Sequence, residues 1–214
     1  MPNDLLAPLM KEKSAATGTR ARVLRAATEV FAEHGYQKAT IAEISRLAGL
    51  SEAGIYEYFQ GKEDLMLTIP NVWVIEAIEE LEEHLFGIRG AFNKLRKFLY
   101  WYIRYIEREP LIAKVVFLHL KGNRSFLDTP VYTNVQAFYR QLLSIFEEGK
   151  ESGEFRHDLN VYGARSVLLG TIEHIVIRWL LKDMSYSLFD NLEATFELIA
   201  TGLAPVPEDT ERPT

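Results

Sequence analysis

The sequence predicts an all-α protein of about nine helices. Apolar residues recur every three to four positions along most of the 214 residues, and no stretch alternates apolar and polar side chains as a half-buried strand would. Glycine and proline stand between the periodic stretches, where helices end. Hydrophobic residues make up 48% of the chain, enough to bury an ordinary core, so we expect one or two globular domains.

The first helix is expected over residues 20–36. Val23, Ala27 and Phe31 share one face of it, and Gly35 is a natural C-terminal stop. This face predicts packing against the helices that follow.

Two short helices joined by a glycine turn come next. Thr40 and Glu43 form the S/T-x-x-E capping box that opens a helix. Gly49 can take the positive φ of a tight turn, and Ser51 is expected to cap a second helix that reaches about residue 59. In a helix-turn-helix the second helix enters the major groove of DNA. A plain helical hairpin in a core is the alternative interpretation of this turn.

The first half of the second helix presents small and polar groups. Ala53 and Gly54 would let the backbone approach base edges and thymine methyls. Tyr56 can donate its hydroxyl to a phosphate, and Thr40 and Lys62 begin helices, whose free amides suit phosphate oxygens. The residues expected to face base edges are Ser51, Glu52, Ala53 and Gly54.

The charge distribution modestly supports such a role. The net charge is -6, which argues against coating of nucleic acid by charge alone, yet the stretch from Lys11 to Lys62 holds eight Lys or Arg against six Asp or Glu. Arg20 and Arg22, at the start of the first helix, are phosphate candidates. The preceding lysines either reach a minor groove or belong to a disordered arm.

The remaining helices are longer, and Pro70 is expected to kink or break the first of them near Ile69, where it would form a hinge. A polar loop is expected over 123–130, and 205–214 reads as a disordered tail. The expected helices cover 62–86, 91–109, 110–122, 131–153, 160–184 and 186–203.

Aromatic side chains concentrate in one of these helices. Phe98, Trp101, Tyr102 and Tyr105 fall on one broad face, which is either ordinary core or, together with Phe117, the wall of a cavity for an apolar ligand.

Three ionisable residues interrupt the most apolar stretch of the chain. Three interpretations of Glu173, His174 and Arg178 are open: a local hydrogen-bonded network, pairing with residues across a subunit interface, or an anchor for a ligand headgroup. Their presence also argues against a membrane span.

Residues 20–66 resemble the N-terminal domain of TetR-family transcriptional repressors. The shared motifs are FAEHGY, TIAEI, AGLS, IYEYF and KEDL. The resemblance implies an all-helical homodimer with one helix-turn-helix per subunit and a larger ligand domain. It places base reading on Ser51, Glu52, Ala53 and Gly54, and phosphate contacts on Thr40, Tyr56 and Lys62. The domains so expected are an arm (1–18), a helix-turn-helix domain (19–66), an effector and dimerisation domain (67–204) and a tail (205–214).

The chain departs from the family pattern at three positions. Glu52 and Glu57 stand where Lys and His are common, and Gly61 replaces a capping residue. Glu52 either accepts a hydrogen bond from cytosine N4 or only favours the helix dipole.

The C-terminal part is most similar to family members that repress fatty-acid degradation and respond to long-chain acyl-CoA. The stretches EREPLIAKVVFLHLKGNRSF and LLGTIEHIVIRWLLKD carry this likeness. It implies that the aromatic helix lines an acyl tunnel. Lys121 and Arg124 would then meet CoA phosphates, with solvated loop charges as the alternative.

We therefore expect a cytoplasmic, ligand-responsive repressor that dimerises through residues 160–203 on a palindromic operator and leaves DNA when an apolar effector binds. The absence of cysteine fits a reducing compartment. No catalytic or metal motif is present, so neither an enzyme nor a cofactor is expected. The alternative is a helical small-molecule or lipid-binding protein with weak or lost DNA binding; an acyl-thioester hydrolase is disfavoured because no nucleophile has an adjacent base.

Overall fold

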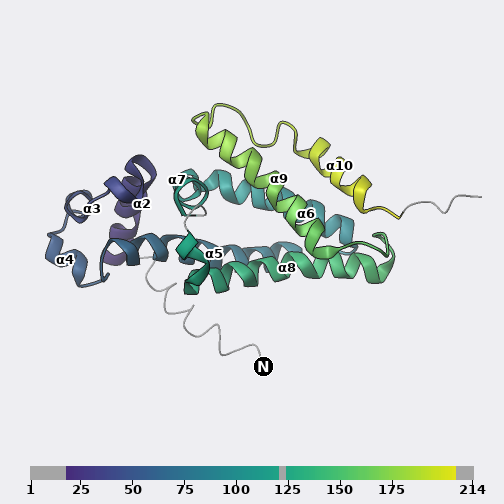
Figure 1. The fold of residues 1–214 in the computed structure, drawn as a ribbon, viewed down its shortest axis with the longest axis horizontal. Helices are drawn as coiled ribbons and strands as arrows, with labels where there is room; N and C mark the ends of the chain where they lie inside the picture. Colours follow the sequence, from purple (N-terminus) through teal and green to yellow (C-terminus); the bar gives the residue numbers. More distant parts are fainter. Residues whose placement is uncertain (1–17, 121–123, 206–214) are drawn as a thin grey trace, which may run out of the picture. The chain divides into compact units, whose positions relative to one another are not determined.

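The computed structural model describes residues 18–120 and 124–205 (Figure 1). All regular structure in these residues is helical, which confirms the predicted all-α class. The elements are α2 (Thr19–Lys38), α3 (Ile41–Ala48), α4 (Glu52–Tyr56), α5 (Lys62–Leu85), α6 (Ala91–Arg108), α7 (Pro110–Lys114), the π-helix η2 (Val115–Leu120), the 3-10 helix η3 (Arg124–Asp128), α8 (Pro130–Ser152), α9 (Val161–Leu181) and α10 (Leu192–Leu203). All but residue 18 of the predicted arm and all but residue 205 of the predicted tail lie outside the described residues.

The expected break at Pro70 is wrong, because α5 runs through this residue without interruption. Proline lacks the amide that would bond the carbonyl four residues earlier, which costs stability in a helix interior. Ile69 and Trp73 on either side are both buried, and their packing holds the segment helical.

Two other expectations need correction. The helix expected over 110–122 changes after one α-helical turn into the π-helix η2, a form in which each amide bonds five residues back. The helix expected from residue 186 begins only at Leu192.

The chain divides into two compact units. Unit 1 takes the residues up to Glu79 together with Glu109–Gln136, and unit 2 takes Glu80–Arg108 together with the residues from Ala137 onward. Helices α5 and α8 contribute residues to both units. These units are defined by packing. The predicted boundary at residue 66 between the helix-turn-helix domain and the effector and dimerisation domain concerns function, and it stays a prediction.

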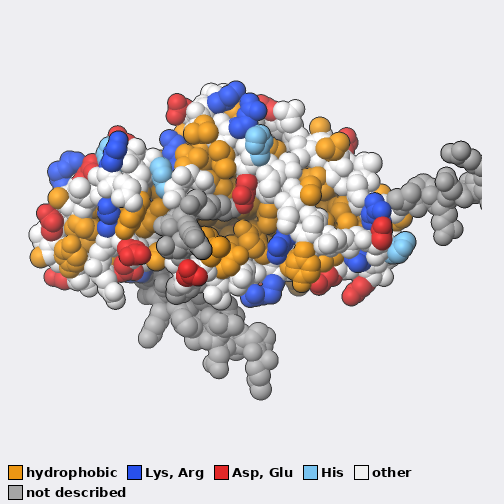
Figure 2. All heavy atoms as spheres, in the orientation of Figure 1, with side chains coloured by type: hydrophobic (Ala, Val, Ile, Leu, Met, Phe, Trp, Pro, Cys, Tyr) orange, Lys and Arg blue, Asp and Glu red, His pale blue; other side chains and the backbone are white. Residues whose placement is uncertain are grey.

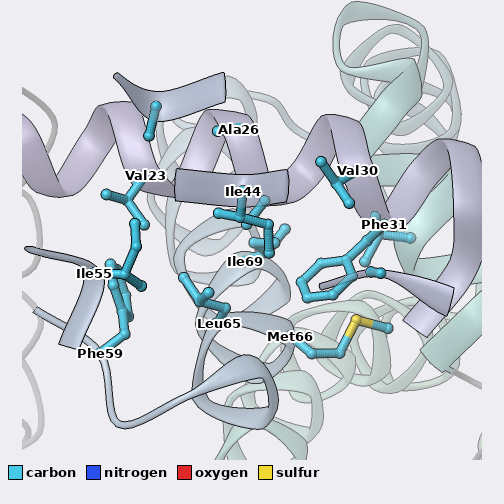
Figure 3. Packing of buried hydrophobic residues seen from close by; sticks show 14 of the residues in the cluster. Val23, Ala26, Val30, Phe31, Ile44, Ile55, Phe59, Leu65, Met66 and Ile69 are labelled. Atoms are coloured by element: carbon cyan, nitrogen blue, oxygen red, sulfur yellow. The ribbon is translucent and has the colours of Figure 1, made fainter. Parts of the chain in front are cut away.

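Unit 1 has one continuous hydrophobic core. Side chains of α2, α3, α4 and α5 point toward one another in it, among them Phe31, Ile44, Ile55 and Leu65 (Figure 3). The same core includes four residues from the segment that follows α6, namely Val115, Leu120, Phe126 and Val131. The helix-turn-helix is thus packed in one body with η2, η3 and the start of α8.

The core of unit 2 is aromatic. Phe98 and Tyr102 of α6 pack with Phe138 of α8, the ring centroids of Phe98 and Tyr102 lying 5.5 Å apart. Helix α10 lies beside α6, where Glu193 accepts a hydrogen bond from the Tyr100 hydroxyl at 2.5 Å. Among the described residues, no helix has the length and apolar character needed to cross a bilayer.

Candidate nucleic-acid interface

Helix α3 begins at the predicted cap. Thr40 Oγ1 accepts a hydrogen bond from the Glu43 amide at 3.2 Å. The Glu43 carboxylate forms a hydrogen bond with His34 Nε2 at 3.0 Å and so ties α3 to α2. Gly49 closes the helix in the left-handed conformation, with φ at 67°, which glycine adopts without strain.

Helix α4 is capped in the same way. Ser51 Oγ accepts a hydrogen bond from the Gly54 amide at 3.1 Å. Ile55 and Phe59 are buried and anchor this segment, while Ser51, Glu52 and Ala53 are exposed and Gly54 is half-buried. The four residues expected to read bases therefore lie together on one helical turn, and at least three of them face solvent.

Gly54 does not owe its identity to packing. A Cβ added there would lie 3.5 Å from Ser51 Oγ and 3.6 Å from Leu50 Cβ, which are ordinary contacts. Its φ is not positive, so alanine would be accepted. Glycine here leaves the surface of α4 free for a close approach from outside.

The candidate phosphate contacts differ in their freedom to reach a partner. Tyr56 is 56% exposed, and Thr40 and Arg22 are exposed as well. Arg25 lies three residues after Arg22, and the two line a shallow depression of about 170 Å³ against α3. Sequence reasoning passed over Arg25, although the i, i+3 spacing places it on the same helix face as Arg22.

Arg20 and Lys62 are engaged within the protein. The Arg20 guanidinium lies over the Phe59 ring at 4.9 Å, and its Nη1 is buried without a hydrogen-bond partner among the described residues. Lys62 Nζ donates to the carbonyls of Ala39 at 3.1 Å and Gln37 at 3.4 Å. A phosphate contact by either side chain would require these interactions to give way.

The surface over α2–α4 carries basic, acidic and hydrophobic side chains side by side (Figure 2). Glu52 and Glu57 are both exposed there. This face is therefore only weakly attractive to a polyanion, and shape and specific contacts must contribute to any binding.

The residues expected to line an effector cavity are divided between the two units. Phe98, Trp101, Tyr102 and Tyr105 are buried in unit 2 and contact one another; the Trp101 and Tyr105 centroids are 5.3 Å apart. Phe117 belongs to η2 in unit 1, where its ring meets that of Trp73 edge-on at 6.4 Å.

His174 and Arg178 are exposed on α9 in the single chain, so the burial that made them notable is not observed. Glu173 is the half-buried member of the trio. Burial, and after it the nearby Tyr139 and Glu173, raises the pKa of the Tyr102 hydroxyl. Glu173 lies four residues after the buried Leu169, on the same face of α9. This spacing could have identified Glu173 as the member of the trio that faces the protein interior.

Lys121 lies outside the described residues, and the side chain of Arg124 lies outside them too. In the described part of the chain, no group of three or more His, Asp or Glu side chains is arranged to hold a metal ion.

Comparison with protein families assigns both parts of the chain. Residues 23–69 match the family described as bacterial regulatory proteins, tetR family, and residues 74–202 match the C-terminal region of YsiA-like proteins, a TetR C-terminal family. The chain belongs to the TetR family. It is thus a helix-turn-helix transcriptional regulator, and the resemblance found in residues 20–66 is confirmed.

Among its TetR-family relatives, the fatty acid metabolism regulator protein of Bacillus subtilis is 29% identical over 85% of this chain and 94% of its own length. The structure of the fatty acid degradation regulator FadR from Bacillus halodurans superposes with a TM-score of 0.81 at 25% identity, covering 87% of this chain and 97% of that one. FadR from B. subtilis in complex with stearoyl-CoA gives 0.79 at 28% identity, covering 86% and 98%. All of these matches are named as regulators, and the expected similarity to fatty-acid regulators is confirmed.

Proposed function

We propose that the chain is a cytoplasmic repressor that binds a palindromic operator as a homodimer and is released by a long-chain acyl-CoA. The observation that carries the proposal is the first turn of α4. Its cap, Ser51, and its buried anchor, Ile55, fix the turn, while Glu52 and Ala53 face solvent. A short rigid helix with an exposed, small-residue N-terminus is what a major groove accepts.

In this proposal, Gly54 and Ala53 set how closely the helix approaches base edges, and Glu52 accepts from a cytosine N4 amine. Tyr56, Thr40 and Arg22 contact phosphates and fix the register. Because Glu52 and Glu57 reduce attraction to any sequence, specificity depends on two half-sites that are read together.

The dimer surface lies on α9 and α10. Val167 and Leu181 of α9 are 63% and 68% exposed, and Leu198 of α10 is 78% exposed. These are high exposed fractions for large aliphatic side chains. His174 and Arg178 are exposed on α9 as well, at helical spacing from Val167 and Leu181. Pairing the two helices with their mates in a four-helix arrangement would bury the apolar residues and give His174 and Arg178 partners in the second subunit.

The proposed effector is an acyl chain joined to coenzyme A. One structural relative was solved with stearoyl-CoA. The aromatic rings of α6 are packed together here, so an acyl chain would have to separate them. Lys121 and Arg124 would meet the CoA phosphates. Release follows if acyl-CoA binds the DNA-incompetent geometry more tightly than the competent one.

The decisive experiment measures fluorescence anisotropy of operator DNA taken from inverted repeats upstream of the gene, at fixed salt. Gly54→Ala should weaken binding by about tenfold or more, because the added Cβ lies at the closest approach to the bases. Ser144→Ala is the control, because Ser144 is exposed on α8, outside both α4 and the proposed dimer surface.

Stearoyl-CoA should then displace the DNA, whereas free CoA and stearate added separately should not. Equal affinity for an inverted repeat and a scrambled duplex would refute operator binding. If stearoyl-CoA bound nonetheless, the result would favour the alternative of a helical lipid-binding protein without DNA recognition.

A further inference from the structure

A groove with a volume of about 340 Å³ lies in unit 1 between α2, α5 and α7. Its walls are mainly apolar and are formed by Leu24, Ile69, Val72, Trp73 and Ile112. The volume lies within the range of small-molecule sites, and mostly apolar walls with few polar groups are their usual composition.

The polar groups at this groove are mainly acidic. Glu29, Glu76 and Glu109 border it, against the single cation Arg25. Glu109 is the N-cap residue of α7, yet its side chain makes no capping hydrogen bond. Neither Glu29 nor Glu109 forms a side-chain hydrogen bond or ion pair with any residue in the described ranges. Their carboxylates are available to a ligand.

We propose that this groove binds a lipophilic organic cation. Apolar walls on three helices require a ligand with an apolar body, and an aromatic residue among them also attracts cations. Three carboxylates against one guanidinium select positive charge and disfavour anions such as fatty acids or acyl-CoA. The site is therefore distinct in ligand class from the proposed effector site.

A ligand in this groove would contact α2, whose residues also form the core under α3 and α4. It would hold α2, α5 and α7 in their observed arrangement and so raise the thermal stability of unit 1. This inference does not depend on the proposed effector or operator, because binding is measured on the protein alone.

The test uses two ions of nearly equal size and shape but opposite charge. Tetraphenylphosphonium should bind the full-length protein in a calorimetric titration, and tetraphenylborate should bind at least tenfold more weakly. Glu29→Gln and Glu109→Gln should each weaken phosphonium binding by about threefold to tenfold, since each removes one nearby opposite charge. Arg25→Gln should strengthen it by a similar factor.

Glu33→Gln is the matched control, because Glu33 is exposed on the same helix but does not line the groove. This variant should bind tetraphenylphosphonium as the unaltered protein does. The proposal is overturned if both ions bind equally, if neither binds, or if the three groove variants leave phosphonium binding unchanged. Opposite effects of the Glu and Arg substitutions would not arise from a general loss of folding.

Discussion

His119 of η2 lies directly against Gly35 of α2. A Cβ placed on residue 35 would come 3.4 Å from the imidazole Cε1 and 3.5 Å from Nδ1. Gly35 has φ 71° and ψ 169°, a combination that is essentially confined to glycine, and it kinks α2 at this point. The end of the first helix thus takes its shape where the π-helix meets it.

Gly35→Ala should lower the free energy of unfolding by about 1–3 kcal/mol, because it imposes a strained backbone and crowds the imidazole. Urea denaturation followed by circular dichroism measures this loss. Gly163→Ala, in a helical turn with only ordinary neighbours, should leave stability unchanged or raise it slightly. Equal free energies of unfolding for the two variants would show that the kink at residue 35 does not require glycine.

His119 should make the protein less stable in mild acid. Burial, and after it the positive charge of Lys114, lowers the pKa of His119 below the ordinary 6.5. The unfolded chain takes up a proton near 6.5 and the folded chain only at lower pH, so the stabilising contribution is complete above 6.5 and is lost as pH falls through the folded-state pKa.

His119→Gln should therefore show a smaller fall in melting temperature between about pH 7.5 and about pH 5 than the unaltered protein. His157→Gln, at an exposed position, is the control and should keep the full fall. The same slope in all three proteins would contradict the assignment to His119.

Lys62→Met should lower the free energy of unfolding by about 1–2 kcal/mol, since the ammonium donates to two carbonyls at the end of α2 and lies 4.5 Å from the centre of the Tyr36 ring. Chemical denaturation tests this directly. If Lys62 served only a DNA phosphate, stability would not change and only operator affinity would fall.

Leu198→Glu should shift the protein toward monomer, weakening the dimer by about tenfold or more, because it places a charge on the surface proposed to pair. Light scattering after size exclusion measures the shift. Phe86→Glu is the control: Phe86 is 90% exposed but follows α5, away from α9 and α10 in sequence and outside the proposed surface. A dimer that survives Leu198→Glu would place the interface elsewhere.

Local chemistry explains why α3 and α4 were predictable. The Thr40 and Ser51 caps and the Gly49 turn depend on residues within three or four positions, and each lies where the sequence predicts it. The aromatic face of α6 is likewise buried as its period indicates. Fold class and family membership follow from such short-range patterns.

Contacts between distant segments were not predictable in the same way. The Arg20 side chain faces Phe59, and Lys62 faces the carbonyl of Ala39, although each sits at a helix start that favours an outward phosphate contact. The π-helix and the continuity of α5 at Pro70 depend on packing that no local pattern encodes. Of the three ionisable residues that interrupt the apolar run of α9, His174 and Arg178 are exposed in the single chain and only Glu173 is half-buried.

The shared core of unit 1 bears on how regulators of this kind can be recombined. Val115, Leu120, Phe126 and Val131 fill the same interior as the helices that would touch DNA, although they follow them by some 50 residues or more in the chain. In a chimaera joined at residue 66, the transplanted helices α2–α4 would pack against residues of the recipient protein in place of these four side chains. A graft that carries the residues up to Glu79 together with Glu109–Gln136 would move the whole interior intact.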